Sequence, residues 1–355
     1  MTRFFDGKLS ALEPYTPGEQ PKDIRNLIKL NTNESPFPPS PRVFDVLNRE
    51  SIENLRLYPA LGVTALHQAT ADFYGVSPEQ VFTANGSDEA LAFCFHGLCP
   101  NGAAFADLTY GFYPVFAGMF GIPYHIVPLR EDFTLAVEDY EGRRETVFLA
   151  NPNAPTGLYL APDRIRALLE QDCDRLVVVD EAYIDFGGES AVALLSEYDN
   201  LLVVQTFSKS RQLAGGRLGL ALGSRELIAD LNTLKFSFNP YSVNNLTLLE
   251  GAAAMQDRAY FDACRREIIR VRTYTIVELR RRGFSVPESL ANFIFAAPPG
   301  ITGRKYYEKL RARGILVRYF EGARTARHVR ITIGREEQMN ALLAATDEIL
   351  GGGVS

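Results

Sequence analysis

Cysteine is scarce in this sequence, and no metal-binding spacing is present. The 355 residues include four cysteines and four histidines, with no CxxC pair and no HExxH motif. Both absences argue against a structural zinc site. So few cysteines in so long a chain fit a reducing cytoplasm. No disulfide or metal staple is required, because a chain of this length can bury a large core. We therefore expect a cytoplasmic protein without a metal.

Positive charge is not in excess, and long hydrophobic runs are missing. Lys and Arg number 37 against 43 Asp and Glu, a net charge of -6. A general nucleic-acid or membrane-surface binder would need a basic field. The most apolar stretch, residues 90–98, is interrupted by His96 and is too short to span a bilayer. Residues 1–8 lack the apolar core of a signal peptide. These features favour small molecules as partners, with no nucleic acid and no membrane.

Short apolar runs alternate with helical patterns from about residue 60. A chain of 355 residues suggests two domains, or one large domain with a satellite. Residues 1–45 are rich in proline and read as an extended arm. The candidate strands are 81–83, 103–106, 124–127, 146–149, 176–179, 201–204 and 218–222. Their spacing suits crossovers through helices, so we predict a mostly parallel α/β sheet.

The alternation of short apolar runs with helical patterns ends near residues 235–240. A long helical tract over 244–282 is followed by further short elements, namely an apolar run at 293–295, a helix over 306–313, strands at 315–317 and 329–333, and a last helix over 336–350. This order predicts a smaller α+β domain. The predicted organisation is residues 1–45 as the N-terminal arm and part of the small domain, 46–240 as the large domain, and 241–355 as the small C-terminal domain.

Polar, glycine-bearing segments follow directly after several predicted strands. They are residues 85–88, 109–111, 151–157, 180–183 and 206–209. In an open α/β sheet, ligands bind outside the carboxyl ends of the strands. The five segments therefore predict a single site built from distant parts of the sequence.

Asp180 and Lys209 each allow two interpretations. A carboxylate at the end of a buried strand needs a cationic partner, so Asp180 could face a protonated ring nitrogen. It could equally be a helix cap or part of a structural ion pair. Lys209 stands beside hydroxyl side chains, and desolvation there would lower its pKa and make it a nucleophilic amine able to form a Schiff base. Most lysines are instead solvated surface groups.

Residues 86–88 open a predicted helix and offer an anion site. The free N–H groups of a helix start, together with Ser208 and Arg217, could hold a phosphate. A plain N-cap is the alternative. Neither a GxxxxGK[ST] loop nor a nucleotide-type GxGxxG occurs.

The segments together resemble the fold type I pyridoxal-phosphate-dependent aminotransferases. The resemblance is carried by residues 151–157, 180–186, 208–209 and 213–219, and within these enzymes the chain is similar to the histidinol-phosphate aminotransferase family. Further matches are residues 14–18, 30–36, 58–59, 86–89, 291–293, 314–320 and 330–334. The resemblance covers nearly the whole chain. It implies a large cofactor-binding domain, with a mostly parallel seven-stranded sheet between helices, and a smaller α+β domain.

The resemblance also implies roles toward pyridoxal 5'-phosphate. Lys209 would hold the cofactor and move a proton, Asp180 would keep the pyridine nitrogen protonated, and Tyr183 would donate to the phenolic oxygen. Tyr110 would stack on the ring. The remaining cofactor residues would be Gly86, Ser87, Asp88, Asn153, Thr206, Ser208, Arg217 and, from the partner subunit of a homodimer with shared active sites, Tyr58.

Substrate-binding residues follow from the same resemblance. Arg330 matches the residue that takes the substrate carboxylate, and Arg318 is the candidate for the substrate phosphate. Without the resemblance, cross-strand salt bridging would be the default reading of both arginines. Tyr15 and Asn33 would complete the substrate site. Many relatives place an asparagine where this chain has Ala154, and Asn153 is the nearest substitute.

The implied activity is transfer of an amino group in histidine biosynthesis. Histidinol phosphate and 2-oxoglutarate would give imidazole-acetol phosphate and glutamate, with ping-pong kinetics through pyridoxamine phosphate. An aromatic amino acid aminotransferase or a phosphorylated-amino-acid decarboxylase on the same scaffold would be compatible with the cofactor residues. A non-catalytic regulator that binds the cofactor is a further alternative.

Overall fold

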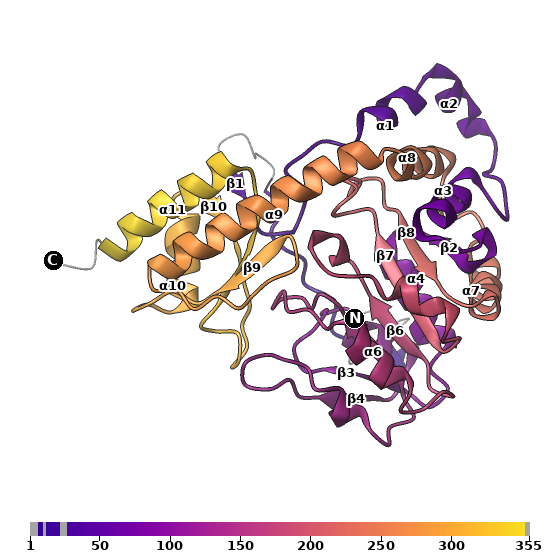
Figure 1. The fold of residues 1–355 in the computed structure, drawn as a ribbon, viewed down its shortest axis with the longest axis horizontal. Coiled ribbons are helices and arrows are strands. Elements are labelled where there is room, and N and C mark those ends of the chain that lie inside the picture. Colours follow the sequence, from indigo (N-terminus) through magenta and orange to yellow (C-terminus); the bar gives the residue numbers. More distant parts are fainter. Residues whose placement is uncertain (1–5, 10–11, 22–26, 352–355) are drawn as a thin grey trace.

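The computed structural model describes residues 6–9, 12–21 and 27–351, which form two lobes (Figure 1). The larger lobe is built around a seven-stranded sheet, and the smaller lobe contains short antiparallel strands and the C-terminal helix. Helix α9 (Arg258–Arg281) runs from the larger lobe along the smaller one, where it packs on α11 (Glu336–Gly351).

All seven predicted strands of the large sheet are confirmed. They are β2 (Val81–Ala84), β3 (Ala103–Ala106), β4 (Tyr124–Val127), β5 (Thr146–Ala150), β6 (Val177–Asp180), β7 (Leu201–Thr206) and β8 (Gly219–Leu222). Their order is β2-β8-β7-β6-β5-β3-β4, and only β8 is antiparallel to its neighbours. The central strands are continuous apolar runs because both faces of the sheet are covered.

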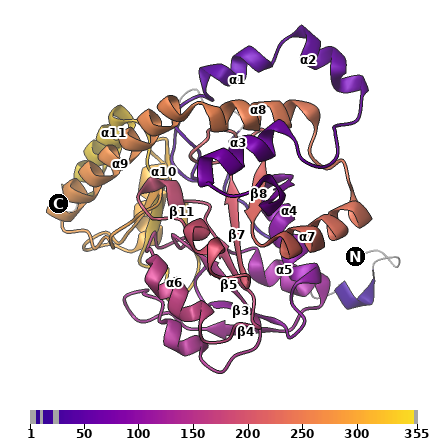
Figure 2. The ribbon, with the colours of Figure 1, turned by 45° about the vertical axis from the view of Figure 1, so that its right-hand side comes forward.

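Helices cover both faces of this sheet. Val177 and Val179 of β6 point into one core with residues of α3 (Ala65–Tyr74), α6 (Pro162–Leu169) and α8 (Asn245–Gln256). Val178 points the opposite way, into a core with α4 (Gly86–Gly97), α5 (Tyr113–Phe120) and α7 (Arg225–Phe238). Successive strand residues alternate between faces, so one strand serves both cores. Figure 2 shows α4, α5 and α7 together on one side of the strands and α6 on the other.

The smaller lobe combines two small sheets with helices. An antiparallel sheet has the order β11 (Arg318–Tyr319), β12 (Val329–Thr332), β9 (Phe293–Ala296). Strand β1 (Ile28–Lys29) pairs in parallel with β10 (Ile315–Leu316), and Leu30 is buried in the core of this lobe beside α9 and α11. The N-terminal segment therefore belongs partly to the small lobe. The remaining helices are α1 (Pro41–Val46), α2 (Arg49–Glu53), α10 (Gly303–Arg311) and the 3-10 turns at Gly7–Leu9, Asn54–Arg56, Pro78–Gln80, Val137–Tyr140, Ile184–Phe186 and Ala191–Ser196.

The predicted helical tract over 244–282 is two helices rather than one. Helix α8 ends at Gln256 and α9 begins at Arg258, and the Asp257 side chain accepts a 3.2 Å hydrogen bond from the Tyr260 backbone N–H. This is an N-cap, which ends one helix and starts the next. Helix α8 packs on α3 in the core of the large lobe. The domain limit at residue 240 stays a prediction, and the packing of α8 favours a later limit near Asp257.

No helix in the described ranges is both long and apolar enough to cross a membrane.

Candidate active site

A cavity of about 470 Å³ opens at the carboxyl ends of β5, β6 and β7. The small lobe contributes two arginines to its wall, and the N-terminal segment contributes Tyr15. The predicted site residues that line this cavity are Tyr15, Asn33, Ser87, Asp88, Tyr110, Asp180, Tyr183, Thr206, Ser208, Lys209, Arg217, Arg318 and Arg330. The structure thus brings together most of the residues that the sequence marked, and their individual roles stay predictions.

Asn153 lies outside the wall of this cavity, and its cofactor-binding role, including whether it replaces the asparagine missing at Ala154, stays a prediction. The Asn153 amide donates to the Leu108 carbonyl at 3.0 Å and to Thr156 Oγ1 at 3.1 Å, and the residue lines a separate cavity of about 190 Å³. Ala154 lines the main cavity instead. Residues 154–156 form a turn directly after Asn153, so the two neighbouring side chains line different cavities.

Tyr58 and Gly86 lie outside the cavity wall. The Tyr58 ring is 79% exposed and stacks on the Tyr241 ring with centroids 4.4 Å apart. Its contribution to the site of a partner subunit stays a prediction. Gly86 begins α4, and a side chain there would meet the Arg217 guanidinium. It therefore borders the predicted phosphate site.

Asp180 is a buried carboxylate at the end of β6. It accepts a hydrogen bond from the Tyr113 hydroxyl at 3.1 Å and one from the Ala182 N–H at 3.2 Å. None of the described residues forms an ion pair with it, and burial raises the pKa of Asp180 to about 7. The structure therefore does not support the alternative interpretation of Asp180 as part of a structural ion pair among the described residues. A cationic group in the cavity would stabilise the charged carboxylate.

Lys209 follows β7 and points into the cavity. Its Nζ donates to the Thr32 carbonyl at 3.3 Å. Burial lowers the pKa of Lys209 to about 8, and the positive charge of Arg330 acts in the same direction. The negative charges of Glu34 and Asp88 oppose this shift. An amine with a pKa near 8 is partly uncharged at neutral pH and can act as a nucleophile.

Hydroxyl groups, a helix N-terminus and a guanidinium meet at one end of the cavity. Ser87 lies in the first turn of α4, and the Thr206 hydroxyl donates to Ser208 Oγ at 3.0 Å. Arg217 lies 3.4 Å from Asp88, whose other oxygen accepts from the Tyr110 hydroxyl at 2.7 Å. Such a combination is suited to an anion with several oxygens, such as a phosphate.

Arg318 and Arg330 line the cavity from the small lobe, as cross-strand neighbours on β11 and β12. Arg330 donates to the Asn31 carbonyl at 3.1 Å, while its buried Nε has no hydrogen-bond partner among the residues that the structure describes. Arg318 donates to the Thr16 and Pro17 carbonyls at 2.8 and 3.1 Å. Neither arginine pairs with a carboxylate of the described residues, so the salt-bridge alternative is not found. A buried guanidinium with an unpaired N–H is suited to a carboxylate ligand.

Three contacts at the site were not predicted. Tyr113 binds Asp180, the Thr32 carbonyl binds Lys209, and Tyr15 stacks on Phe112 with ring centroids 4.2 Å apart. Tyr113 comes two residues after the polar segment 109–111, so extending that segment would have found it. The Thr32 contact uses a backbone oxygen, for which the side-chain sequence holds no signal.

The arrangement fits the cofactor that the resemblance implies. A buried carboxylate without a cation, an amine of lowered pKa and an anion site surround one cavity. These are the groups that a cationic pyridine ring, a reactive aldehyde and a phosphate require. Gly219 allows the backbones to approach at the anion site, because a Cβ there would collide with the Ser87 N atom and the Gly86 backbone.

Comparisons with known proteins place the chain in a family. The model of aminotransferase class I and II matches residues 25–345. A histidinol-phosphate aminotransferase of Pseudomonas putida (strain W619) is 48% identical over 347 residues, which are 97% of this chain and 99% of that relative. One of Clostridium botulinum (strain 657 / Type Ba4) is 43% identical and is covered to 99%, as is this chain.

The fold has solved counterparts as well. A crystal structure of histidinol-phosphate aminotransferase from Sinorhizobium meliloti in complex with pyridoxal-5'-phosphate superposes with a TM-score of 0.87, at 23% identity and with 99% of both chains covered. The predicted fold type I architecture is thereby confirmed. From the cavity, the family match and the two relatives together, the chain belongs to the class I and II aminotransferases, within the family of the histidinol-phosphate aminotransferases.

Proposed function

We propose that this chain transfers an amino group between histidinol phosphate and 2-oxoglutarate with bound pyridoxal 5'-phosphate, giving imidazole-acetol phosphate and glutamate in histidine biosynthesis. One observation carries the proposal. Asp180, Lys209 and two arginines line one cavity in a chain 48% identical to a histidinol-phosphate aminotransferase. Arg318 and Arg330 distinguish this assignment from cofactor binding alone, because they offer two positive charges to a substrate with two anionic groups or to two alternating substrates.

The cofactor would be held at three places. Arg217, Ser87 and Ser208 would take its phosphate, Asp180 would pair with the ring nitrogen, and Lys209 would hold the aldehyde carbon. When bound, pyridoxal phosphate supplies an electron sink for the negative charge that develops at the amino-bearing carbon of the substrate. Burial raises the pKa of Asp180, and pairing with a cationic ring nitrogen would lower it.

Lys209 would move the proton during catalysis. Because burial lowers its pKa to about 8, the free amine can both accept and release a proton near neutral pH. Tyr183 would stabilise the phenolic oxygen of the cofactor through its hydroxyl, which Asn33 Nδ2 orients at 3.0 Å. Burial raises the pKa of Tyr183, so this hydroxyl keeps its proton and acts as a donor.

Substrate recognition would combine charge and aromatic surface. Arg330 would bind the carboxylate of glutamate, and Arg318 would bind the phosphate of histidinol phosphate. The rings of Tyr15, Phe112 and Phe320 line the same cavity and would contact the planar imidazole. An aromatic amino acid aminotransferase would use the same rings, so Arg318 is the residue that separates the two functions.

We also propose a homodimer that works in the cytoplasm. Exposed apolar side chains lie close to Tyr58 in the sequence, namely Leu57, Leu61 and Val63, and the exposed Tyr241 stacks on it. A second copy covering this surface would bury them and bring Tyr58 toward a neighbouring site. The four cysteines are free, which fits a reducing compartment. In a mixture of Tyr58→Phe and Lys209→Ala chains, an activity above that of both variants would support shared sites, and no gain on mixing would refute them. A monomer mass by light scattering would refute the homodimer.

Absorption spectroscopy tests the proposed activity directly. The purified protein is loaded with pyridoxal phosphate, and histidinol phosphate, phenylalanine and glutamate are added in separate cuvettes. The proposal expects the band of the bound cofactor to convert to the amino form fastest with histidinol phosphate. Conversion only by phenylalanine and glutamate would establish the aromatic alternative. If no bound band forms, the assignment of Lys209 is wrong.

A further inference from the structure

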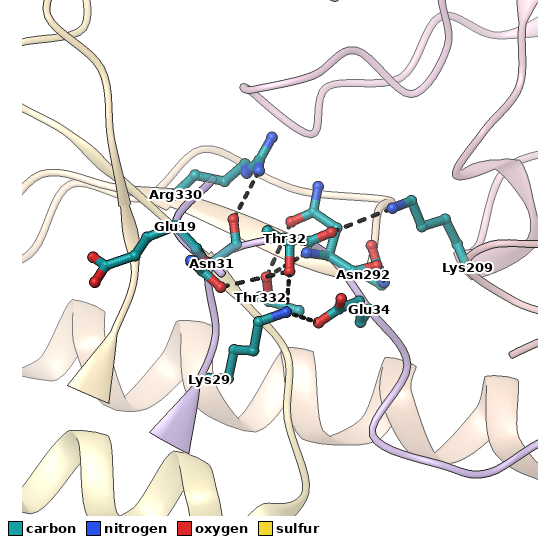
Figure 3. A network of polar contacts seen from close by, with 10 residues as sticks. Glu19, Lys29, Asn31, Thr32, Glu34, Lys209, Asn292, Arg330 and Thr332 are labelled. Atoms are coloured by element: carbon teal, nitrogen blue, oxygen red, sulfur yellow. Dashed lines mark hydrogen bonds and ion pairs between the residues drawn. The ribbon is translucent and has the colours of Figure 1, made fainter. Parts of the chain in front are cut away.

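Residues 31–34 lie between the small lobe and Lys209, and their backbone oxygens contact both. The Asn31 carbonyl accepts from Arg330 at 3.1 Å, and the Thr32 carbonyl accepts from Lys209 at 3.3 Å. Figure 3 shows Lys209 reaching toward Thr32 from one side, while Arg330 approaches Asn31 from the other. We call residues 31–34 the linking segment.

Asn33 anchors the linking segment to the small lobe. Its backbone N–H donates to Thr332 Oγ1 at 3.0 Å, and its side-chain oxygen accepts from the same hydroxyl at 3.0 Å. Its carbonyl accepts from Asn292 Nδ2 at 3.0 Å. Asn33 is buried and adopts a left-handed backbone with φ of 56°, which fixes the direction in which the Thr32 carbonyl points.

Lys29 and Glu34 form an ion pair across the linking segment. Lys29 Nζ also donates to Thr32 Oγ1 at 2.8 Å, so one ammonium group binds both residues (Figure 3). Burial works to raise the pKa of Glu34, but hydrogen bonds from Lys29 and Thr32 and the positive charges of Lys29 and Lys209 together leave that pKa lowered. Glu34 is therefore charged at neutral pH, and it is held beside the Thr32 carbonyl that contacts Lys209.

Four charged groups act on the Lys209 amine. Arg330 and Arg217 disfavour its positive charge, whereas Glu34 and Asp88 favour it. Asp88 is already engaged by Arg217 and the Tyr110 hydroxyl at the anion site. The effect of the Glu34 charge on Lys209 therefore depends on the linking segment, whereas the effect of Asp88 depends on the anion site.

We propose that the linking segment binds the Lys209 ammonium whenever this amine is free of the cofactor. Glu34 is a positioning residue that favours the charged form of Lys209, and Lys29 holds Glu34 in place. The proposal deepens the proposed function, on which it rests, because an aminotransferase must release its lysine from the cofactor in every turnover. The Thr32 carbonyl then receives an N–H of the ammonium, and the Glu34 charge offsets the nearby guanidinium groups.

Shifts of the Lys209 pKa in opposite directions in two variants distinguish this electrostatic role from simple packing. Replacing Glu34 by glutamine removes a negative charge, so the pKa of Lys209 should fall. Replacing Lys29 by methionine keeps the apolar stem and removes a positive charge, so Glu34 is no longer neutralised and the pKa of Lys209 should rise. Loosening of the linking segment alone would weaken the Thr32 contact in both variants and lower this pKa in both.

Competitive labelling with acetic anhydride measures the Lys209 pKa in the full chain loaded with pyridoxamine phosphate, in which Lys209 carries no cofactor. Mass spectrometry of the peptide containing Lys209 gives the fraction acetylated against pH. We expect a midpoint near 8 for the parent protein. We expect shifts of about half a pH unit downward in Glu34→Gln and upward in Lys29→Met. The matched control is Glu336→Gln, which removes a carboxylate that pairs with Arg270 outside the cavity wall.

An unchanged midpoint in Glu34→Gln, or shifts of the same sign in both variants, would overturn the proposal. If Glu34→Gln does not fold, Glu34→Asp is used, since retracting the carboxylate should also lower the midpoint. The labelling is repeated on the full chain without any cofactor. A chain that fails to bind pyridoxamine phosphate contradicts the proposed function, while its labelling midpoints still decide the role of Glu34.

Discussion

The Tyr113 hydroxyl donates a 3.1 Å hydrogen bond to Oδ2 of Asp180, and both side chains are buried. Tyr113 begins α5 and Asp180 ends β6, so the contact spans two elements of the sheet edge. Burial raises the pKa of Asp180, and the hydrogen bond from Tyr113 opposes that rise. The protonation of Asp180 therefore depends on the hydrogen bond from Tyr113.

Tyr113→Phe should weaken pyridoxal phosphate binding by about 10-fold at pH 7, because a hydrogen bond to a charged group contributes about 1.5–3 kcal/mol and part of it is recovered by water. The loss should be smaller at pH 9, where Asp180 is charged in either protein. Fluorescence titration measures the affinity at both pH values. Tyr140→Phe is the matched control, since the buried Tyr140 hydroxyl has no hydrogen-bond partner in the described part of the chain. Equal affinities in the Tyr113→Phe and parent proteins would contradict the role of the contact.

In the cofactor-free protein, Asp180→Asn should gain free energy of unfolding relative to the parent as the pH rises from 5 to 8. The folded pKa of Asp180 is about 7, above its unfolded value, so its contribution favours folding at low pH and is lost as pH rises toward 7. The asparagine does not titrate, so the variant does not lose this stability. Its free energy of unfolding relative to the parent should rise by roughly 2–3 kcal/mol between pH 5 and pH 8. Urea unfolding at both pH values measures it. The exposed Asp132→Asn should show no such growth, and a pH-independent difference for Asp180→Asn would refute the raised pKa.

The sheet and most of the site could be predicted because their signals are local. Val177 to Val179 form a continuous apolar run, which indicates a buried central strand, and Asp180 follows it directly. Parallel strands bring such polar ends to one edge, so the cavity follows from the order of elements. The prediction of Lys209 rests on the same logic, because it follows β7, whereas Arg217 precedes β8 and was predicted as part of the anion site.

Contacts between distant segments could not be predicted in this way. Strand β1 pairs with β10 near the opposite end of the chain, and nothing within residues 28–29 specifies that partner. The helix boundary at Asp257 was also missed, because an aspartate inside an apolar helical pattern reads as a surface residue until its cap geometry is seen. The direction of Asn153 depends on the path of residues 151–157, which residue types alone do not fix.

Arg318→Leu should reduce kcat/KM for histidinol phosphate by about 30- to 100-fold, because a charged hydrogen-bond donor to the phosphate is lost. The loss for phenylalanine should be less than about 5-fold, from release of the Thr16 and Pro17 carbonyls alone. Steady-state kinetics with both substrates checks the difference. Arg324→Leu is the control, since Arg324 pairs with Asp107 outside the cavity wall. Equal losses for the two substrates would remove Arg318 from phosphate recognition.

Gly219→Ala should disturb the anion site selectively. A Cβ at Gly219 would overlap the Ser87 N atom and the Gly86 backbone, so α4 must move away from β8. Overpacking of this kind costs about 1–3 kcal/mol of folding free energy. Because the helix N-terminus is displaced, the affinity for pyridoxal phosphate should fall more than that for pyridoxal, which has no phosphate.

Gly215→Ala is the neighbouring control, since its Cβ would meet no atom within 4 Å. It should leave both affinities and the stability within about 0.5 kcal/mol of the parent. Urea unfolding and fluorescence titration separate the two effects of Gly219→Ala. If this variant binds both ligands with parent affinity, the phosphate does not depend on the close approach of α4 and β8. Equal losses for pyridoxal phosphate and pyridoxal would instead indicate a general distortion of the cavity, because only a displaced anion site discriminates between ligands that differ by one phosphate.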